Sequence, residues 1–165
     1  LINGKLLIKI ISRTPIARLT STSSPQSASI GFMGEDLDYF YLPRQAIDQA
    51  IASGDKSWQQ IAELTLPAGS TDEIDNQLKA AARELIELFS QELAGRGFEL
   101  TRVSARDSAS FITSANYLGR SIEISWGSIN DLGLKVEVME RLLAQDENKK
   151  VRGINLIDPL KPTVR

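Results

Sequence analysis

A long amphipathic segment followed by three alternating segments constrains the fold of this chain most. From residue 71 to residue 94, apolar side chains recur at the three- and four-residue spacing of one helix face. Gly95 and Gly97 then predict the end of that helix. Apolar and polar residues alternate, as in strands, in the segments 98–103, 109–115 and 120–126. We therefore expect a helix packed on the apolar face of an antiparallel sheet.

Shorter elements precede this unit. Apolar runs at 28–33 and 38–42 flank a polar turn that contains Gly, which predicts a β-hairpin. Pro43 suits the first turn of a helix over 44–52. The spacing of apolar residues over 58–64 predicts one more short helix.

A second amphipathic helix is predicted over 130–144, with Ser128 or Asn130 as its N-cap. A strand is predicted over 151–157, and the prolines that follow it favour a position at the edge of the sheet. This order of elements predicts an α+β fold, in which helices pack on one side of a mixed or antiparallel sheet.

The N-terminal region predicts a domain boundary. Residues 5–11 and 16–20 have the composition of strands, and residues 21–29 hold six Ser or Thr and one Pro, which is typical of a linker. The sequence therefore predicts two units, 1–21 and 22–165.

The composition excludes several classes of function. The chain has 165 residues and contains neither Cys nor His, which excludes disulfides, thiolate nucleophiles, His or Cys metal sites and Ser-His-Asp catalysis. The 19 basic and 21 acidic residues give a net charge of −2, which argues against a dedicated nucleic-acid binder. We also find no run of apolar residues long enough for a membrane helix.

One set of short patterns imitates an acyl-serine enzyme. Ser53 and Lys56 form an S-x-x-K pattern, with 128–130 and 161–163 in the places of the two further motifs of that class. The nucleophile of such a site begins a buried helix, whereas Ser53 follows a predicted one. This difference argues against an enzyme. A serine acyl-transfer enzyme that uses Ser53 and Lys56 is kept as the alternative hypothesis.

The C-terminal segment concentrates positive charge. Residues 149–165 hold five Lys or Arg and one Asp. Lys and Pro at a sheet edge block the addition of further strands, yet an edge strand also offers the free backbone groups to which a partner peptide can bind. The residues leave both interpretations open.

Five stretches of the chain share their order with one known family. They are Lys5–Thr20 (KLLIKIISRTPIARLT), Ile30–Leu42, Leu64–Pro67 with the long helix, Gly119–Gly127 with the helix over 130–144, and Val151–Arg165 (VRGINLIDPLKPTVR). In this order they resemble the FtsQ/DivIB family of bacterial cell-division proteins. A Glu-Arg-x-Pro-x-Ala phrase of that family is matched at Arg13, Pro15 and Ala17. The chain departs from the family at Ser12, at Asn155, where the family has Asp, and in the longer connection 44–63.

This resemblance implies a scaffold without enzymatic activity, cofactor or metal. Residues 1–21 would end a POTRA module, and residues 22–165 would form the β domain of a single-span inner-membrane protein, outside that membrane at the division septum. The span would lie outside this chain. A more general envelope binding module linked to POTRA units is a further alternative.

The resemblance also implies partners and a binding site. The expected partners are FtsB-like and FtsL-like division proteins, with no nucleic acid, and a partner strand would add to the terminal strand. The expected binding residues are Val151, Arg152, Gly153, Ile154, Asn155, Leu156, Ile157 and Asp158. Among them, Arg152 would pair with carboxylates of the partner.

Overall fold

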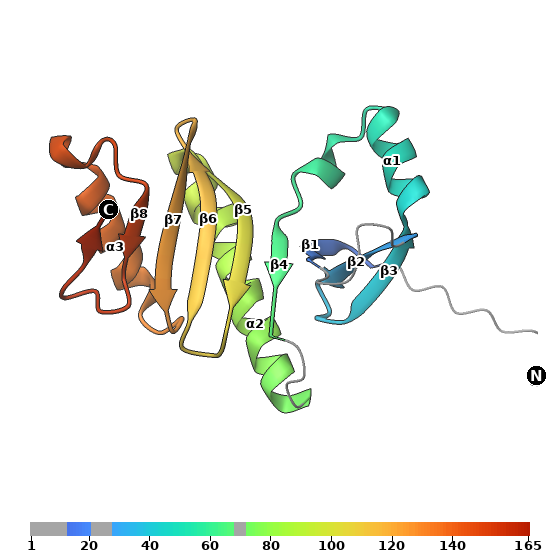
Figure 1. Ribbon diagram of the computed structural model, residues 1–165, viewed down its shortest axis with the longest axis horizontal. Coiled ribbons are helices and arrows are strands. Elements are labelled where there is room, and N and C mark those ends of the chain that lie inside the picture. The colour runs from blue at the N-terminus through green and yellow to red at the C-terminus, as the bar shows by residue number, and fades with distance from the viewer. Residues whose placement is uncertain (1–12, 21–27, 68–71) are drawn as a thin grey trace, which may run out of the picture.

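The computed structural model describes residues 13–20, 28–67 and 72–165, whose strands form one continuous sheet (Figure 1). The strands lie in the order β3-β2-β1-β4-β5-β6-β7-β8-β9. They are β1 (Pro15–Leu19), β2 (Ser29–Gly34), β3 (Tyr39–Pro43), β4 (Glu63–Thr65), β5 (Phe98–Ala105), β6 (Phe111–Tyr117), β7 (Arg120–Gly127), β8 (Gly153–Asn155) and β9 (Thr163–Val164). The pairings of β1 with β4, β4 with β5 and β7 with β8 are parallel, and the others are antiparallel. The predicted α+β class with a mixed sheet is therefore confirmed.

Three of the predicted α-helices are present in the described residues. They are α1 (Arg44–Ala52), α2 (Asp72–Leu88) and α3 (Leu132–Leu143). α2 continues into a π-helical turn, η2 (Phe89–Leu93), and a 3-10 turn, η3 (Ala94–Arg96), before Gly97 closes it at a φ of 87°. α2 and α3 cover one face of β5–β8, as predicted, whereas α1 lies beside β3 (Figure 1). We call β5–β8 with α2 and α3 the helix-covered half, and β1–β3 with α1 the hairpin half.

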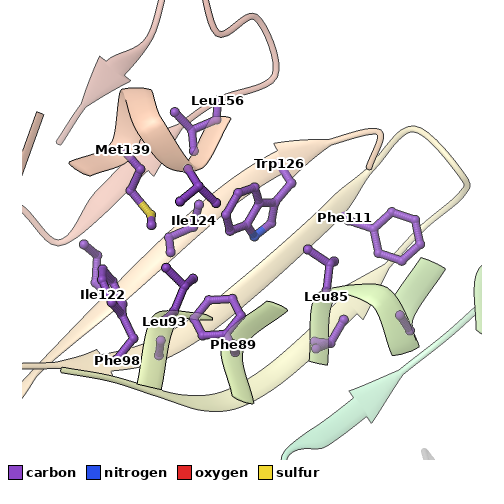
Figure 2. Close-up of a cluster of buried hydrophobic side chains, with 14 of the residues drawn as sticks. Leu85, Phe89, Leu93, Phe98, Phe111, Ile122, Ile124, Trp126, Met139 and Leu156 are labelled. Carbon is purple, nitrogen blue, oxygen red and sulfur yellow. The ribbon is translucent and has the colours of Figure 1, made fainter. Parts of the chain in front are cut away.

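Aromatic side chains fill the core between α2 and the sheet (Figure 2). Phe89 packs edge-on against Phe98 and Trp126, with ring centroids 6.2 and 6.3 Å away. Trp126 is fully buried, and its indole Nε1 donates a hydrogen bond to the buried Thr113 hydroxyl at 2.9 Å. Because both polar atoms are paired, burying them carries no desolvation penalty for an unmet hydrogen bond.

α2 also contacts the hairpin half. Its Lys79 forms an ion pair with Asp75 at 2.6 Å, and the Lys79 ammonium lies 4.1 Å from the centre of the Tyr39 ring in β3. The Tyr39 hydroxyl donates a hydrogen bond to Asp75 at 3.2 Å. Burial, and then the charge of Asp75, raise the pKa of Tyr39 far above its usual value. These three side chains fix the position of β3 relative to α2.

Two details of the predicted elements are wrong. The segment predicted as a short helix over 58–64 forms a 3-10 turn, η1 (Lys56–Gln59), and then the strand β4. β4 exists because β1 and β5 bind it from both sides, and three residues are too few to show a strand period. The N-cap of α3 is Asp131, at a φ of 57°, instead of Ser128 or Asn130.

The strand assigned to the first predicted unit lies inside the sheet. β1 pairs with β2 on one side and with β4 on the other, so hydrogen bonds join it to the sheet of the second unit. The predicted strand over 5–11 lies outside the described residues, and the division into two units stays a prediction. None of the helices in the described ranges is long and apolar enough to cross a bilayer.

Candidate interaction edge

The eight residues predicted to bind a partner lie on β8 and directly beside it. Four of these eight residues are exposed and four are buried. The exposed ones are Arg152, Asn155, Ile157 and Asp158, and the buried ones are Val151, Gly153, Ile154 and Leu156. Only the first group presents side chains to a partner.

β8 does not form the edge of the sheet, contrary to the prediction. It pairs with β7 on one side and with β9 on the other, where Ile154 faces Val164 and Asn155 faces Thr163. The chain turns after Asp158, whose carbonyl accepts a hydrogen bond from the Lys161 amide at 3.0 Å. The prolines that suggested an edge therefore belong to the connection of a short β8–β9 hairpin.

Arg165 holds β9 in place. The amides of Arg152 and Gly153 both donate to the Arg165 carbonyl, at 2.8 and 3.0 Å, and the Arg165 amide donates to the Gly153 carbonyl at 3.0 Å. The Arg165 guanidinium crosses β8 and forms an ion pair with Glu123 of β7. A Cβ atom at Gly153 would lie 2.5 Å from Arg165 Nε, so this crossing requires glycine. We call these contacts the Arg165 latch.

Hydrogen-bond alternation decides which backbone groups face outward. Because Gly153 and Arg165 form a hydrogen-bonded pair, the amide and carbonyl groups of Gly153 and Asn155 point toward β9. On the outer side of β9, Val164 offers both groups, whereas Pro162 has no amide hydrogen to donate. The outer side of β9 thus offers fewer groups to a partner than the side of β8 that β9 covers.

Apolar and basic side chains surround this hairpin. Ile157, Leu160 and Val164 are 61, 83 and 37% exposed, and exposed apolar groups that gather in one place mark interaction surfaces. A hollow of about 680 Å³ beside β8 is lined by Ser114, Arg120, Ser121, Glu123, Lys149, Lys150 and Arg152. The surroundings therefore suit a partner that carries apolar and acidic side chains.

The residues predicted to bind a partner do not include Leu160, Val164 or Arg165. Leu160 and Val164 stand in a Pro-containing tail whose pattern does not show which side chains face solvent. Arg165 acts through its backbone and through a distant Glu, which no local spacing indicates. No pattern in the sequence marks these three residues, because their roles depend on how the segment folds back on β8.

The patterns that imitated a serine enzyme lie at a helix end. Ser53 is the exposed C-cap of α1, and its hydroxyl donates to the Ala50 carbonyl at 2.7 Å. Asp55 accepts hydrogen bonds from the amide and hydroxyl of Ser57, at 3.0 and 2.5 Å, and these bonds lower the pKa of Asp55. The sequence Ser53 to Ser57 thus ends α1 and caps η1.

The sequence pattern also gives no sign of a buried lysine that stabilises the fold. Lys135 of α3 is 3% exposed, and its ammonium donates to the carbonyls of Trp126 and Ser128, both at 2.7 Å. Burial lowers the pKa of Lys135, with the charge of Asp131 opposing this shift. The lysine fixes the end of β7 to the first turn of α3.

No group of three or more acidic side chains in the described ranges is arranged to hold a metal ion. Asp36 and Asp38, at the tip of the β2–β3 hairpin, instead pair with Arg13 at 3.0 and 2.6 Å.

Comparison of the chain with protein-family models and with curated proteins gives no match.

Proposed function

We propose that this chain is a non-enzymatic scaffold of the bacterial division machinery, of the FtsQ/DivIB type, that binds a partner strand at its C-terminal edge. The β2–β3 hairpin, α2, β7, α3 and β8 correspond to the stretches of sequence that carry the resemblance, which supports this proposal. The observation that carries the proposal is the β8–β9 hairpin, a two-residue edge strand surrounded by exposed apolar and basic side chains.

The partner strand takes the place of β9 on β8. In that position it meets the amide and carbonyl groups of both Gly153 and Asn155, which β9 now binds. On the outer side of β9, it would meet the two groups of Val164 and no amide hydrogen from Pro162. Because main-chain hydrogen bonds supply affinity in strand addition, replacement of β9 is the favoured geometry.

Side chains around the hairpin select the partner. Ile157 and Leu160 offer apolar surface to alternate side chains of the incoming strand, and Arg152 and Lys161 suit carboxylates. Each exposed ion pair adds about 0 to 1 kcal/mol, so the charges set register more than affinity. FtsB-like proteins, bound to FtsL-like ones, are the proposed partners, and the domain would act on the outer side of the inner membrane.

Proline substitutions on the two strands of the hairpin test this mechanism. We expect Asn155→Pro to weaken binding of the soluble segment of an FtsB-like protein at least tenfold, because residue 155 loses the amide that faces the partner. Thr163→Pro is the matched variant, and it should strengthen binding, because it weakens β9 and leaves β8 intact.

Calorimetric titration measures both affinities, and circular dichroism checks that each variant is folded. Unchanged affinity of a folded Asn155→Pro variant would contradict strand addition at β8. Weaker binding by Thr163→Pro would instead show that the partner requires β9.

A further inference from the structure

A second uncovered strand edge lies in the interior of the sheet. β4 pairs with β5 from Arg102 to Ser104, whereas β5 begins four residues earlier, at Phe98. Over residues 98–101, β5 pairs with β6 on one side, and no strand of the described ranges pairs with the other side. The residues before β4 turn away from β5 there (Figure 1).

The uncovered edge presents backbone hydrogen-bonding groups. The Leu118 amide donates to the Gly97 carbonyl at 3.1 Å, so the next hydrogen-bonded pair of β5 and β6 is Glu99 with Asn116. The amide and carbonyl groups of Phe98 and Leu100 consequently point away from β6, into the gap beside β4. Such groups are the template that an added strand binds.

Hollows open from this gap on both faces of the sheet. The hollow on the face of α2 measures about 540 Å³, and apolar side chains such as Ile61, Ile86 and Phe98 line most of it. The hollow on the opposite face measures about 410 Å³ and is mainly polar. Both are lined by Gln60, Ile61, Glu99 and Leu100, so the two hollows meet at the uncovered edge.

The helix beside the apolar hollow departs from α geometry at this place. Phe89 and Ser90, which line the hollow, lie in the π-helical turn η2. π-Helical turns inside α-helices are rare and occur frequently at functional sites. The turn is a second feature that coincides with the gap, independent of the strand edge.

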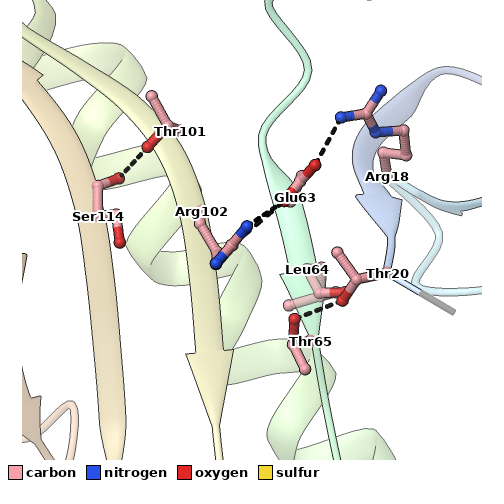
Figure 3. Close-up of polar contacts among 8 residues, drawn as sticks. All are labelled: Arg18, Thr20, Glu63, Leu64, Thr65, Thr101, Arg102 and Ser114. Atoms are coloured by element: carbon pink, nitrogen blue, oxygen red, sulfur yellow. Dashed lines mark hydrogen bonds and ion pairs between the residues drawn. The ribbon is translucent and has the colours of Figure 1, made fainter. Parts of the chain in front are cut away.

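The charges of the described residues that line the polar hollow balance one another. Glu63 accepts hydrogen bonds from Arg18 at 2.7 Å and from two nitrogens of Arg102 at 2.7 and 3.1 Å (Figure 3). The bonds from Arg102 contribute most to the lowered pKa of Glu63, which keeps this carboxylate ionised. With Glu99, the described residues of the lining include two Arg and two Glu, so this lining has no excess of either charge to attract a charged side chain.

We propose that residues 98–101 form a docking site for an uncharged extended peptide of a partner protein. The peptide pairs with the backbone of Phe98 and Leu100. Its alternate side chains enter the two hollows, an aliphatic one on the side of α2 and a small polar one on the side of Glu63. At roughly 3.3 Å per residue, the four-residue edge accommodates about four residues of peptide. This site is separate from the β8–β9 hairpin and does not depend on the function proposed for it.

Amide hydrogen exchange of the full chain tests the site directly. In the free protein, we expect the amides of Phe98 and Leu100 to exchange at least a hundredfold faster than the amide of Glu99. A capped Val-Thr-Val-Thr-Val peptide should slow both amides. The matched Val-Glu-Val-Glu-Val and Val-Lys-Val-Lys-Val peptides should bind at least tenfold more weakly. Equal protection of residues 98–100 in the free protein, or no effect of saturating Val/Thr peptide, would overturn the proposal.

Variants of α2 test the apolar hollow. Ile86→Glu should reduce binding of the Val/Thr peptide at least tenfold, whereas Ile74→Glu, at an exposed position of the same helix away from the hollow, should leave it unchanged. Ser90→Trp is a second variant at an exposed position, so it blocks the hollow without disturbing the core. Wild-type affinity in a folded Ile86→Glu or Ser90→Trp variant would overturn the proposal.

Discussion

The helix-covered half and the hairpin half share one sheet, yet they are stabilised differently. Between α2, α3 and β5–β8, large side chains such as Phe89, Phe111 and Trp126 are almost completely buried. In the hairpin half, Phe32 and Met33 are buried, whereas Tyr41 is 69% exposed, and α1 contributes Ile47 as its buried residue. The helix-covered half therefore has a core of its own, whereas the hairpin half depends on its attachment to that core.

The attachment itself is narrow. β4, with three residues, connects β1 to β5 through parallel pairings on both sides. On the helix-free face, Glu63 binds Arg18 of β1 and Arg102 of β5 (Figure 3). On the other face, Tyr39 contacts Lys79 and Asp75 of α2. Substitutions should therefore lower the free energy of unfolding most in the core, less at the attachment and least at the far edge.

The largest effect is expected in the core of the helix-covered half. Phe89→Ala should lower the free energy of unfolding by about 3 to 5 kcal/mol, because it removes a buried ring that packs against two other aromatic rings. Ile74→Ala, on the exposed side of the same helix, is the control and should cost less than about 1 kcal/mol. Urea unfolding followed by circular dichroism measures both. An equal loss of stability in both variants would contradict the view that the core of this half stabilises the protein most.

A smaller effect is expected at the attachment. Glu63→Gln should cost about 1 kcal/mol at pH 7, because it removes the anion that links Arg18 to Arg102 on partly exposed side chains. Since the pKa of Glu63 is lowered in the folded state, its stabilising contribution is complete above the unfolded pKa of about 4.3 and disappears as the pH falls through the folded value.

Urea unfolding at pH 7 and at pH 3 checks this prediction. The difference between wild type and Glu63→Gln should narrow at pH 3. Glu87→Gln, in the exposed helical pair with Arg83, is the control and should cost about 0.3 to 0.5 kcal/mol. A difference for Glu63→Gln that stays the same at both pH values would refute the role of its charge.

The smallest effect is expected at the far edge of the helix-covered half. Gly153→Ala should cost about 0.5 to 1 kcal/mol, because the new Cβ displaces the Arg165 side chain and breaks its exposed ion pair with Glu123. Gly133→Ala in α3 is the control: its Cβ would meet open space, and it should stabilise the protein by about 0.5 to 1 kcal/mol. Thermal unfolding measures both, and no loss in Gly153→Ala would contradict the latch.

The sequence predicts the elements whose pattern is local. The periods of the long helix and of the three strands after it, together with the Gly-containing turn of the first hairpin, correctly place most of both halves. It does not predict β4 or β9, because segments of three and two residues show no period and exist through bonds to distant strands. For that reason, β8 was expected at the edge of the sheet.

For the candidate sites, too, the sequence shows what is local and not what depends on the fold. Positive charge and the prolines after the predicted strand point to the C-terminal segment, but the exposure of Leu160 and the role of Arg165 depend on how that segment folds back. The uncovered edge of β5 is invisible in the sequence, because residues 98–101 alternate in the same way whether or not a strand lies beside them. Lys135 was missed because a helix pattern does not show that its one lysine is buried.

The short β4 also has a consequence for the order in which the molecule assembles. The β5–β6–β7 meander forms between near neighbours in the chain, whereas β4 pairs with β1 and β5 across long connections that contain α1 and α2, and such distant pairings slow folding. The two tryptophans report on the two halves, because Trp126 lies in the helix-covered core and Trp58 packs against Phe32 at 5.6 Å. In refolding experiments, we expect the fluorescence of Trp126, in a Trp58→Phe variant, to change before that of Trp58, in a Trp126→Phe variant. Simultaneous changes would mean that both halves assemble in one step.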